Sequence, residues 1–84
     1  MKKYEEVEKV ILNYGKEHDT FTAYKIAKVL CEKHKVDFWG AEGNNWRVIV
    51  SQVINKMLEE GKIKLLDEVP STPLKKKIYR LVVR

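Results

Sequence analysis

Apolar residues recur at helical spacing along the segment 44–61 and form one face of a predicted helix. That face consists of Trp46, Ile49, Val50, Val53, Ile54, Met57 and Leu58. Asn44 or Asn45 can cap the start, because an Asn side chain accepts hydrogen bonds from the unpaired amides of a first turn. Gly61 is the expected terminator, since glycine enters the left-handed conformation at little cost. The pattern therefore predicts a helix over residues 45–60.

Two shorter amphipathic helices are predicted before it, over residues 3–18 and 23–34. The first has an apolar stripe formed by Tyr4, Val7, Ile11 and Tyr14, with Val10 beside it. Such a stripe usually packs on its own core, and its near-heptad spacing also suits a partner helix across a dimer interface. Thr22 is the expected N-cap of the second helix, with Phe21 and Ile26 placed for a hydrophobic staple.

The C-terminal segment 62–83 is predicted to form a β-hairpin. Residues 62–69 form the first strand, and Pro70 to Pro73 form a connection in which proline disfavours regular pairing. Residues 74–83 form the return strand, where Tyr79, Leu81 and Val83 alternate with Ile78, Arg80 and Val82. The alternation breaks down toward the end, where both faces are apolar, and one of the faces is expected to pack on the core.

The connection 35–43 between the second and third helices is longer than a tight helix-turn-helix needs. It contains Phe38 and Trp39, followed by two glycines. Both aromatic side chains are expected to lie under the core as loop anchors. The less favoured alternative is that they are exposed and stack on a partner or on bases.

Length and charge narrow the class of protein. The 84 residues fit a single domain spanning 1–84, and 44% hydrophobic with 35% charged residues is typical of a globular fold. The net charge is +5, and residues 62–84 contain seven basic residues against two acidic ones, so this segment accounts for the whole excess. A localised basic segment favours a polyanionic partner.

No apolar run has the length of a membrane span and no signal-peptide pattern occurs, which predicts a cytoplasmic, intracellular protein without membrane attachment.

The chain shows little sign of cofactor or catalytic chemistry. One cysteine, Cys31, excludes an internal disulfide, and with only His18 and His34 beside it a zinc site is not expected. Cys31 is interpreted first as a small buried hydrophobe, and second as an intermolecular disulfide across a two-fold axis. No nucleophile–base pair, glycine-rich phosphate loop or carboxylate pair is evident, so we expect no enzyme, no cofactor and no small-molecule ligand.

The outward face of the third predicted helix is polar and almost uncharged. Amides, a hydroxyl and a flanking guanidinium are the groups that read base edges in a major groove, although an ordinary solvated helix back explains the face equally well. The candidate DNA-binding residues on this helix are Asn44, Arg47, Val48, Ser51, Gln52, Asn55 and Lys56. The cluster Lys75, Lys76 and Lys77 is either a phosphate contact or an aggregation-blocking edge, and the scarcity of nearby acids favours the first.

The order of elements, three helices and then a basic hairpin, resembles an α+β winged helix-turn-helix domain. The most specific likeness lies in residues 50–63, which end in Leu-Glu-Glu-Gly-Lys-Ile, and in residues 77–81, Lys-Ile-Tyr-Arg-Leu. These segments are similar to the recognition helix and wing of small prokaryotic and archaeal regulators of the multiple-antibiotic-resistance and arsenic-repressor type. They also resemble compact winged-helix proteins of archaea and archaeal viruses.

This resemblance implies sequence-specific binding of double-stranded DNA by a transcriptional regulator. It implies that the third helix enters the major groove and that the three consecutive lysines contact the backbone or minor groove. The resemblance also implies a homodimer. If the protein is viral, it is expected to act inside the host cell. The long connection 35–43 departs from the family pattern. The competing hypothesis is a winged-helix module for protein–protein interaction, since a fold does not fix function.

Overall fold

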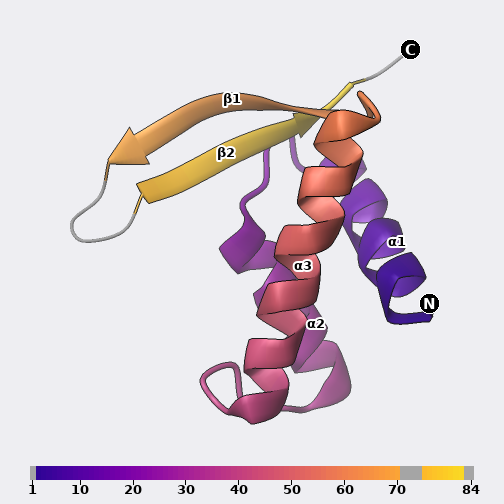
Figure 1. Cartoon of the computed structure of the whole chain (residues 1–84), viewed down its shortest axis with the longest axis vertical. Coiled ribbons are helices and arrows are strands. Elements are labelled where there is room, and N and C mark those ends of the chain that lie inside the picture. The colour runs from indigo at the N-terminus through magenta and orange to yellow at the C-terminus, as the bar shows by residue number, and fades with distance from the viewer. Residues whose placement is uncertain (1, 71–74, 83–84) are drawn as a thin grey trace.

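The computed structural model describes residues 2–70 and 75–82 and has an α+β layout with winged-helix topology. Its elements are α1 (Lys2–Glu17), α2 (Ala23–His34), α3 (Ala41–Glu59), β1 (Ile63–Pro70) and β2 (Lys75–Leu81). The two strands pair antiparallel and extend away from the helices (Figure 1). The predicted fold class is confirmed.

The ends of α2 follow from local sequence. Thr22 has an extended backbone, and its side-chain oxygen accepts a hydrogen bond from the Lys25 backbone N–H at 3.2 Å, which confirms the predicted N-cap. The helix ends at His34, and its C-cap Lys35 adopts the left-handed conformation with φ of 56°. The backbone N–H of Val36 then donates to the Cys31 carbonyl at 3.0 Å, closing the last turn.

The third helix begins four residues earlier than expected. Its N-cap is Gly40, which makes no side-chain cap, so the predicted capping by Asn44 or Asn45 is wrong. The early start depends on Gly43, which is buried in the first turn and lies directly against backbone atoms of Asp37 and Phe38. Here a close backbone approach sets the start of the helix, and no capping side chain is needed.

The other end of α3 agrees with the prediction. Gly61 has φ of +74°, and its N–H donates to the Leu58 carbonyl at 3.1 Å. The Lys62 N–H donates to the Met57 carbonyl at 2.9 Å, so the two bonds form a Schellman motif that satisfies carbonyls at the helix end. The chain is thereby turned directly into β1.

The hairpin includes a β-bulge within β1. Leu65 pairs with Tyr79 and Asp67 with Ile78, so Leu66 is the extra residue. β1 extends through Pro70, which we expected in the connection; residues 71–74 lie outside the described residues. Because of the bulge, the neighbouring side chains of Leu65 and Leu66 are both about half exposed.

The segment just before α2 joins the hairpin through an isolated β-bridge between Phe21 and Tyr79. Phe21 and Tyr79 exchange backbone hydrogen bonds of 3.0 and 2.9 Å, and their rings are 5.7 Å apart. Tyr79 is buried and Leu81 is half-buried, so the face of β2 that holds these two residues packs on the core. This bridge fixes the base of the hairpin against the helices.

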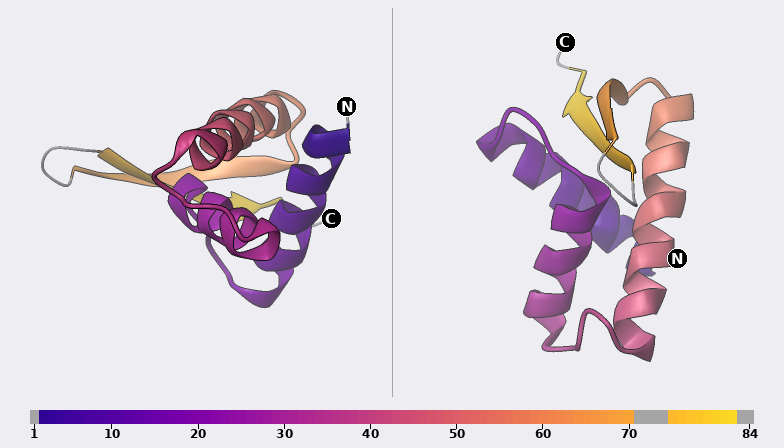
Figure 2. Two further views of the ribbon diagram at one scale, coloured as in Figure 1. Left: turned by 90° about the horizontal axis from the view of Figure 1, so that it is seen from below. Right: turned by 90° about the vertical axis from the view of Figure 1, so that its left-hand side faces the viewer.

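One core lies among all the elements and positions α3. α2 and α3 run antiparallel beside each other, and α1 packs on both of them and on the base of the hairpin (Figure 2). The buried side chains of the core are Val7, Ile11, Phe21, Ile26, Ala27, Leu30, Cys31, Phe38, Trp46, Val50, Val53, Ile54, Met57, Ile63 and Tyr79. Within the described part of the chain, no helix combines the length and apolar character of a membrane span.

Candidate nucleic-acid interface

The outward face of α3 is exposed and largely unpaired. Helical spacing places Asn44, Val48, Ser51 and Asn55 in one row pointing away from the core, and each is exposed. Among the described residues, no side chain forms a hydrogen bond or ion pair with Asn44, Ser51 or Asn55. Their amide and hydroxyl groups are therefore free to bond a ligand, as readout of base edges requires.

A second row of α3 turns toward α1. The Tyr4 hydroxyl of α1 donates to the side-chain carbonyl of Gln52, and Asn45 lies beside a hollow lined partly by α1. Lys56, one turn beyond Gln52, is exposed and makes no ion pair with a described residue. Gln52 thus has an intramolecular partner that the sequence did not indicate, while Lys56 has a free charge.

Arg47 is held by two aromatic rings of the connection between α2 and α3. Its guanidinium carbon lies 5.2 Å from the Phe38 ring centre and 5.4 Å from the Trp39 ring centre. Its Nε is buried and has no hydrogen-bond partner within residues 2–70 and 75–82. Arg47 therefore lies at the border between the exposed row of α3 and the aromatic connection.

The two aromatic residues of the connection have opposite environments. Phe38 is buried and anchors the loop, as expected, whereas Trp39 is 73% exposed, so the expectation that it lies under the core is wrong. The sequence does not distinguish the two positions, because both are large, apolar and adjacent. Only the tertiary packing of the Asp37–Gly40 turn places one ring inward and the other outward.

The hairpin of β1 and β2, here called the wing, contributes the basic residues of this surface. The hairpin passes one flank of α3, and α1 packs on the other flank (Figures 1 and 2). Lys77 is exposed and pairs in register with Glu68. Lys75 and Lys76 belong to β2, but their side chains lie outside the described residues. Lys64 and Arg80 are also exposed, in paired positions nearer the base of the hairpin.

The base of the wing is tied to α1 by an ion pair. The Lys62 ammonium donates to Glu8 at 2.9 Å and lies 3.4 Å from Glu60. The hydrogen bond to Glu8, reinforced by both carboxylates, raises the pKa of Lys62. Lys62 is consequently engaged within the protein and is a weaker candidate for contact with a polyanion than Lys77.

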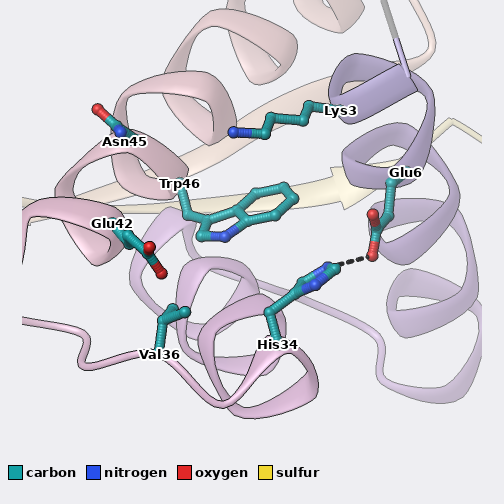
Figure 3. Close-up of a pocket in the computed structure, with 7 residues that line it drawn as sticks. All are labelled: Lys3, Glu6, His34, Val36, Glu42, Asn45 and Trp46. Atoms are coloured by element: carbon teal, nitrogen blue, oxygen red, sulfur yellow. Dashed lines mark hydrogen bonds and ion pairs between the residues drawn. The ribbon is translucent and has the colours of Figure 1, made fainter.

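A hollow of about 450 Å³ lies between α1, the end of α2 and the start of α3. Figure 3 shows the Trp46 indole between Lys3 and His34. The His34 ring stacks on Trp46 at 4.7 Å and bonds Glu6 at 2.7 Å, and the Lys3 ammonium lies 5.5 Å from the Trp46 ring centre. These contacts tie three helices together around the N-terminal half of α3.

Glu6 is the charged centre of that contact. Its carboxylate lies 3.1 Å from the Lys33 ammonium as well as bonding His34. Partial burial acts to raise the pKa of Glu6, but the hydrogen bonds from His34 and Lys33 outweigh it and lower the pKa overall. The ionised form of Glu6 is therefore favoured in the folded protein.

Cys31 lies inside the core, as the first interpretation of this residue expected. Only 2% of it is exposed, and burial raises the pKa of its thiol. An intermolecular disulfide would require the side chain to leave the core, and it stays an untested prediction. No group of three His, Cys, Asp or Glu residues in the described part of the chain is arranged to hold a metal ion.

Comparisons of this chain with protein families, with characterised proteins and with solved structures found no match. Its winged-helix topology thus stands on the order and pairing of its own elements.

Proposed function

We propose that this protein binds double-stranded DNA and acts as a transcriptional regulator. In this proposal the row Asn44, Val48, Ser51 and Asn55 enters the major groove, and the basic wing contacts the phosphate backbone. The observation that carries the proposal is the exposed and almost uncharged face of α3, where Asn44, Ser51 and Asn55 bond no other described side chain, beside a wing that holds the net positive charge of the chain.

Each part of this surface has a distinct physical role. Amides and hydroxyls discriminate bases by hydrogen bonding, and Val48 offers apolar contact to a thymine methyl group. Wing lysines attract phosphates without reading sequence, and they make binding salt-dependent through counterion release. Arg47, Gln52 and Lys56 flank the row, and we expect Lys56 to contact phosphate because no described residue neutralises it.

The proposal includes a homodimer, because a regulator of this size commonly reads two half-sites separated by about one helical turn. Exposed apolar side chains on the wing, Leu65 and Leu66, offer a dimer surface, whereas Val7 and Ile11 of the α1 stripe are buried in the core of the protomer. Sedimentation with and without reductant tests the dimer and any role of Cys31. A monomer at all concentrations would refute this part of the proposal.

Substitutions on α3 test base readout directly. Asn55→Ala is compared with Asn13→Ala, an exposed asparagine on α1, so that both variants exchange the same residue type on a helix surface. Against a duplex selected from a random library, we expect Asn55→Ala to weaken binding about ten-fold, as loss of a bidentate base contact does. Asn13→Ala should bind as the wild type does. Equal affinities of the two variants would contradict insertion of α3.

A protein-interaction module is the second candidate, favoured by a specific observation. Trp39 is 73% exposed and Val48 is 47% exposed, and both are apolar. Such side chains are enriched at protein interfaces. A complex with a protein partner that is insensitive to salt, in the absence of any duplex binding, would support this candidate against DNA binding.

A further inference from the structure

The aromatic cluster at the start of α3 is separate from the row of groups assigned to base readout. It consists of Tyr24, Phe38 and Trp39, with Arg47 against the last two. The Tyr24 and Phe38 rings meet edge to face at 5.1 Å, and Phe38 meets Trp39 edge to face at 4.8 Å. The rings thus form a continuous series from α2 to the N-terminus of α3.

Trp39 is presented to solvent by a rigid turn. The Gly40 N–H donates to the Asp37 carbonyl at 3.0 Å, and the Trp39 N–H donates to the Asp37 carboxylate at 3.1 Å. The same turn packs so closely on Gly43 that even one added carbon there would overlap the Asp37 and Phe38 carbonyls. Trp39 is therefore exposed from a turn that is hydrogen-bonded internally and packed against the first turn of α3.

A rigid exposed indole is a preformed stacking surface. Arg47 covers part of the Trp39 ring, and with 73% of the residue exposed an open surface remains. The cation–π contact with Arg47 supports one side of the indole, and a guanidinium beside an aromatic ring also suits contact with a stacked base. Because Tyr24 on the other side of Phe38 is also exposed, the indole belongs to a larger aromatic surface, and an exposed apolar patch commonly marks a binding site.

The charges around the cluster favour a nucleic acid. Lys28 lies 5.7 Å from the Tyr24 ring centre, Lys25 is exposed on the same helix, and Arg47 adds a third cation. Asp37 is the acidic group of the turn, and its carboxylate already accepts the Trp39 N–H. Aromatic rings interleaved with cations are the combination that binds unstacked bases and their phosphates.

We propose that Trp39, supported by Arg47 and Phe38, stacks on an unpaired base next to the duplex that α3 contacts. The preferred ligand would then be duplex DNA with a bulged or extruded nucleotide, rather than a perfectly paired duplex. This inference rests on the proposed DNA binding, and it adds a preference that the α3 row and the wing do not supply. An intact base pair keeps both base faces stacked, so only an unpaired base can use this surface.

The experiment measures binding to two probes that differ by one unpaired thymine in an otherwise identical short duplex. Wild type is compared with Trp39→Leu, which keeps apolar bulk but removes the aromatic face, and with Trp39→Phe, which keeps a smaller ring. We expect wild type to bind the bulged probe about ten-fold more tightly than the paired probe. The Trp39→Phe variant should keep part of this preference, and the Trp39→Leu variant should lose it. Affinity for the paired duplex, and its salt dependence, should be the same in all three proteins, because stacking releases no counterions.

Fluorescence provides a second measurement. The protein has two tryptophans, and Trp46 is buried, so the difference between wild type and Trp39→Phe isolates the emission of Trp39. Quenching of that difference signal by the bulged probe, and not by the paired duplex, is expected. Equal preferences for the bulge in wild type and Trp39→Leu would overturn this inference and leave DNA binding standing. Failure of wild type to bind either probe would overturn both proposals.

Discussion

Substitution of Gly43 by alanine tests the close packing that fixes the start of α3. A Cβ at this position would lie 2.2 Å from the Asp37 carbonyl oxygen and 2.3 Å from that of Phe38. Ordinary carbon–oxygen contacts are about 3.3 Å or longer, so the helix and the turn would have to separate by about 1 Å. Both obstructing atoms belong to the backbone, so no side-chain rotation relieves the overlap.

The expected cost follows from two opposing effects. Overpacking of a buried site costs about 1–3 kcal/mol, whereas exchange of glycine for alanine within a helix contributes up to about 1 kcal/mol of stability. The advantage of alanine over glycine is smaller in the first turn of a helix, so we expect Gly43→Ala to lower the free energy of unfolding by about 1–2 kcal/mol. For a domain of this size that corresponds to a fall in Tm of about 5–15 °C.

Thermal and urea unfolding, followed by circular dichroism, measure this change. Gly40→Ser is the matched control, because it adds a side chain three residues earlier, where the nearest atoms are 3.4 Å away and φ is −84°. Serine there can cap the helix, so the control should be at least as stable as wild type. A Gly43→Ala protein that melts at or above the wild-type temperature would refute the reasoning.

Three further predictions concern single positions, each measured by urea unfolding. Lys35→Gly should stabilise the fold by about 0.5 kcal/mol, because Lys35 has φ of 56° and glycine relieves that strain at some cost in chain entropy. An unchanged midpoint of urea unfolding would contradict this expectation. Gly61→Ala should destabilise by about 1 kcal/mol, since φ is +74° although nothing lies within 4 Å of the added carbon; no loss would count against a strained backbone. The pKa of Glu6 is lowered in the fold, so its ionised form contributes stability above its ordinary pKa of about 4.3 that is lost as the pH falls through the lowered value. Glu6→Gln should remove that part of the acid dependence, with an effect below about 1 kcal/mol because the pair is partly exposed; an unaltered pH profile would contradict this assignment.

Sequence alone predicts the elements whose ends are set by local chemistry. Thr22 and Gly61 mark helix ends because a cap oxygen and a left-handed backbone act within a few residues. Sequence alone misplaces the start of α3, because Asn44 is a favourable cap by residue type, whereas the contact of Gly43 with the preceding turn depends on tertiary packing. The register shift at Leu66 is likewise a property of strand pairing.

The sequence predicts which side chains of the candidate interface are exposed better than it predicts which other residues they contact. Helical periodicity places Ser51 and Asn55 in solvent, and both are exposed. Periodicity cannot reveal that Gln52 accepts a bond from Tyr4, or that Trp39 is exposed, since these depend on how elements distant in sequence meet. The aromatic cluster therefore emerges only from the three-dimensional arrangement.

The central claim, DNA binding through α3 and a basic wing, is tested most directly by titration onto duplex DNA at several salt concentrations. Wild type is compared with a variant in which Lys75, Lys76 and Lys77 are all alanine, and with a Lys9→Ala, Lys16→Ala control on the exposed face of α1. We predict steep salt dependence that flattens by about three units in the wing variant and by less than one in the control, since each lost phosphate contact removes about 0.9 from the slope. Undetectable binding of wild type at low salt, or equal slopes in all three proteins, would contradict the account.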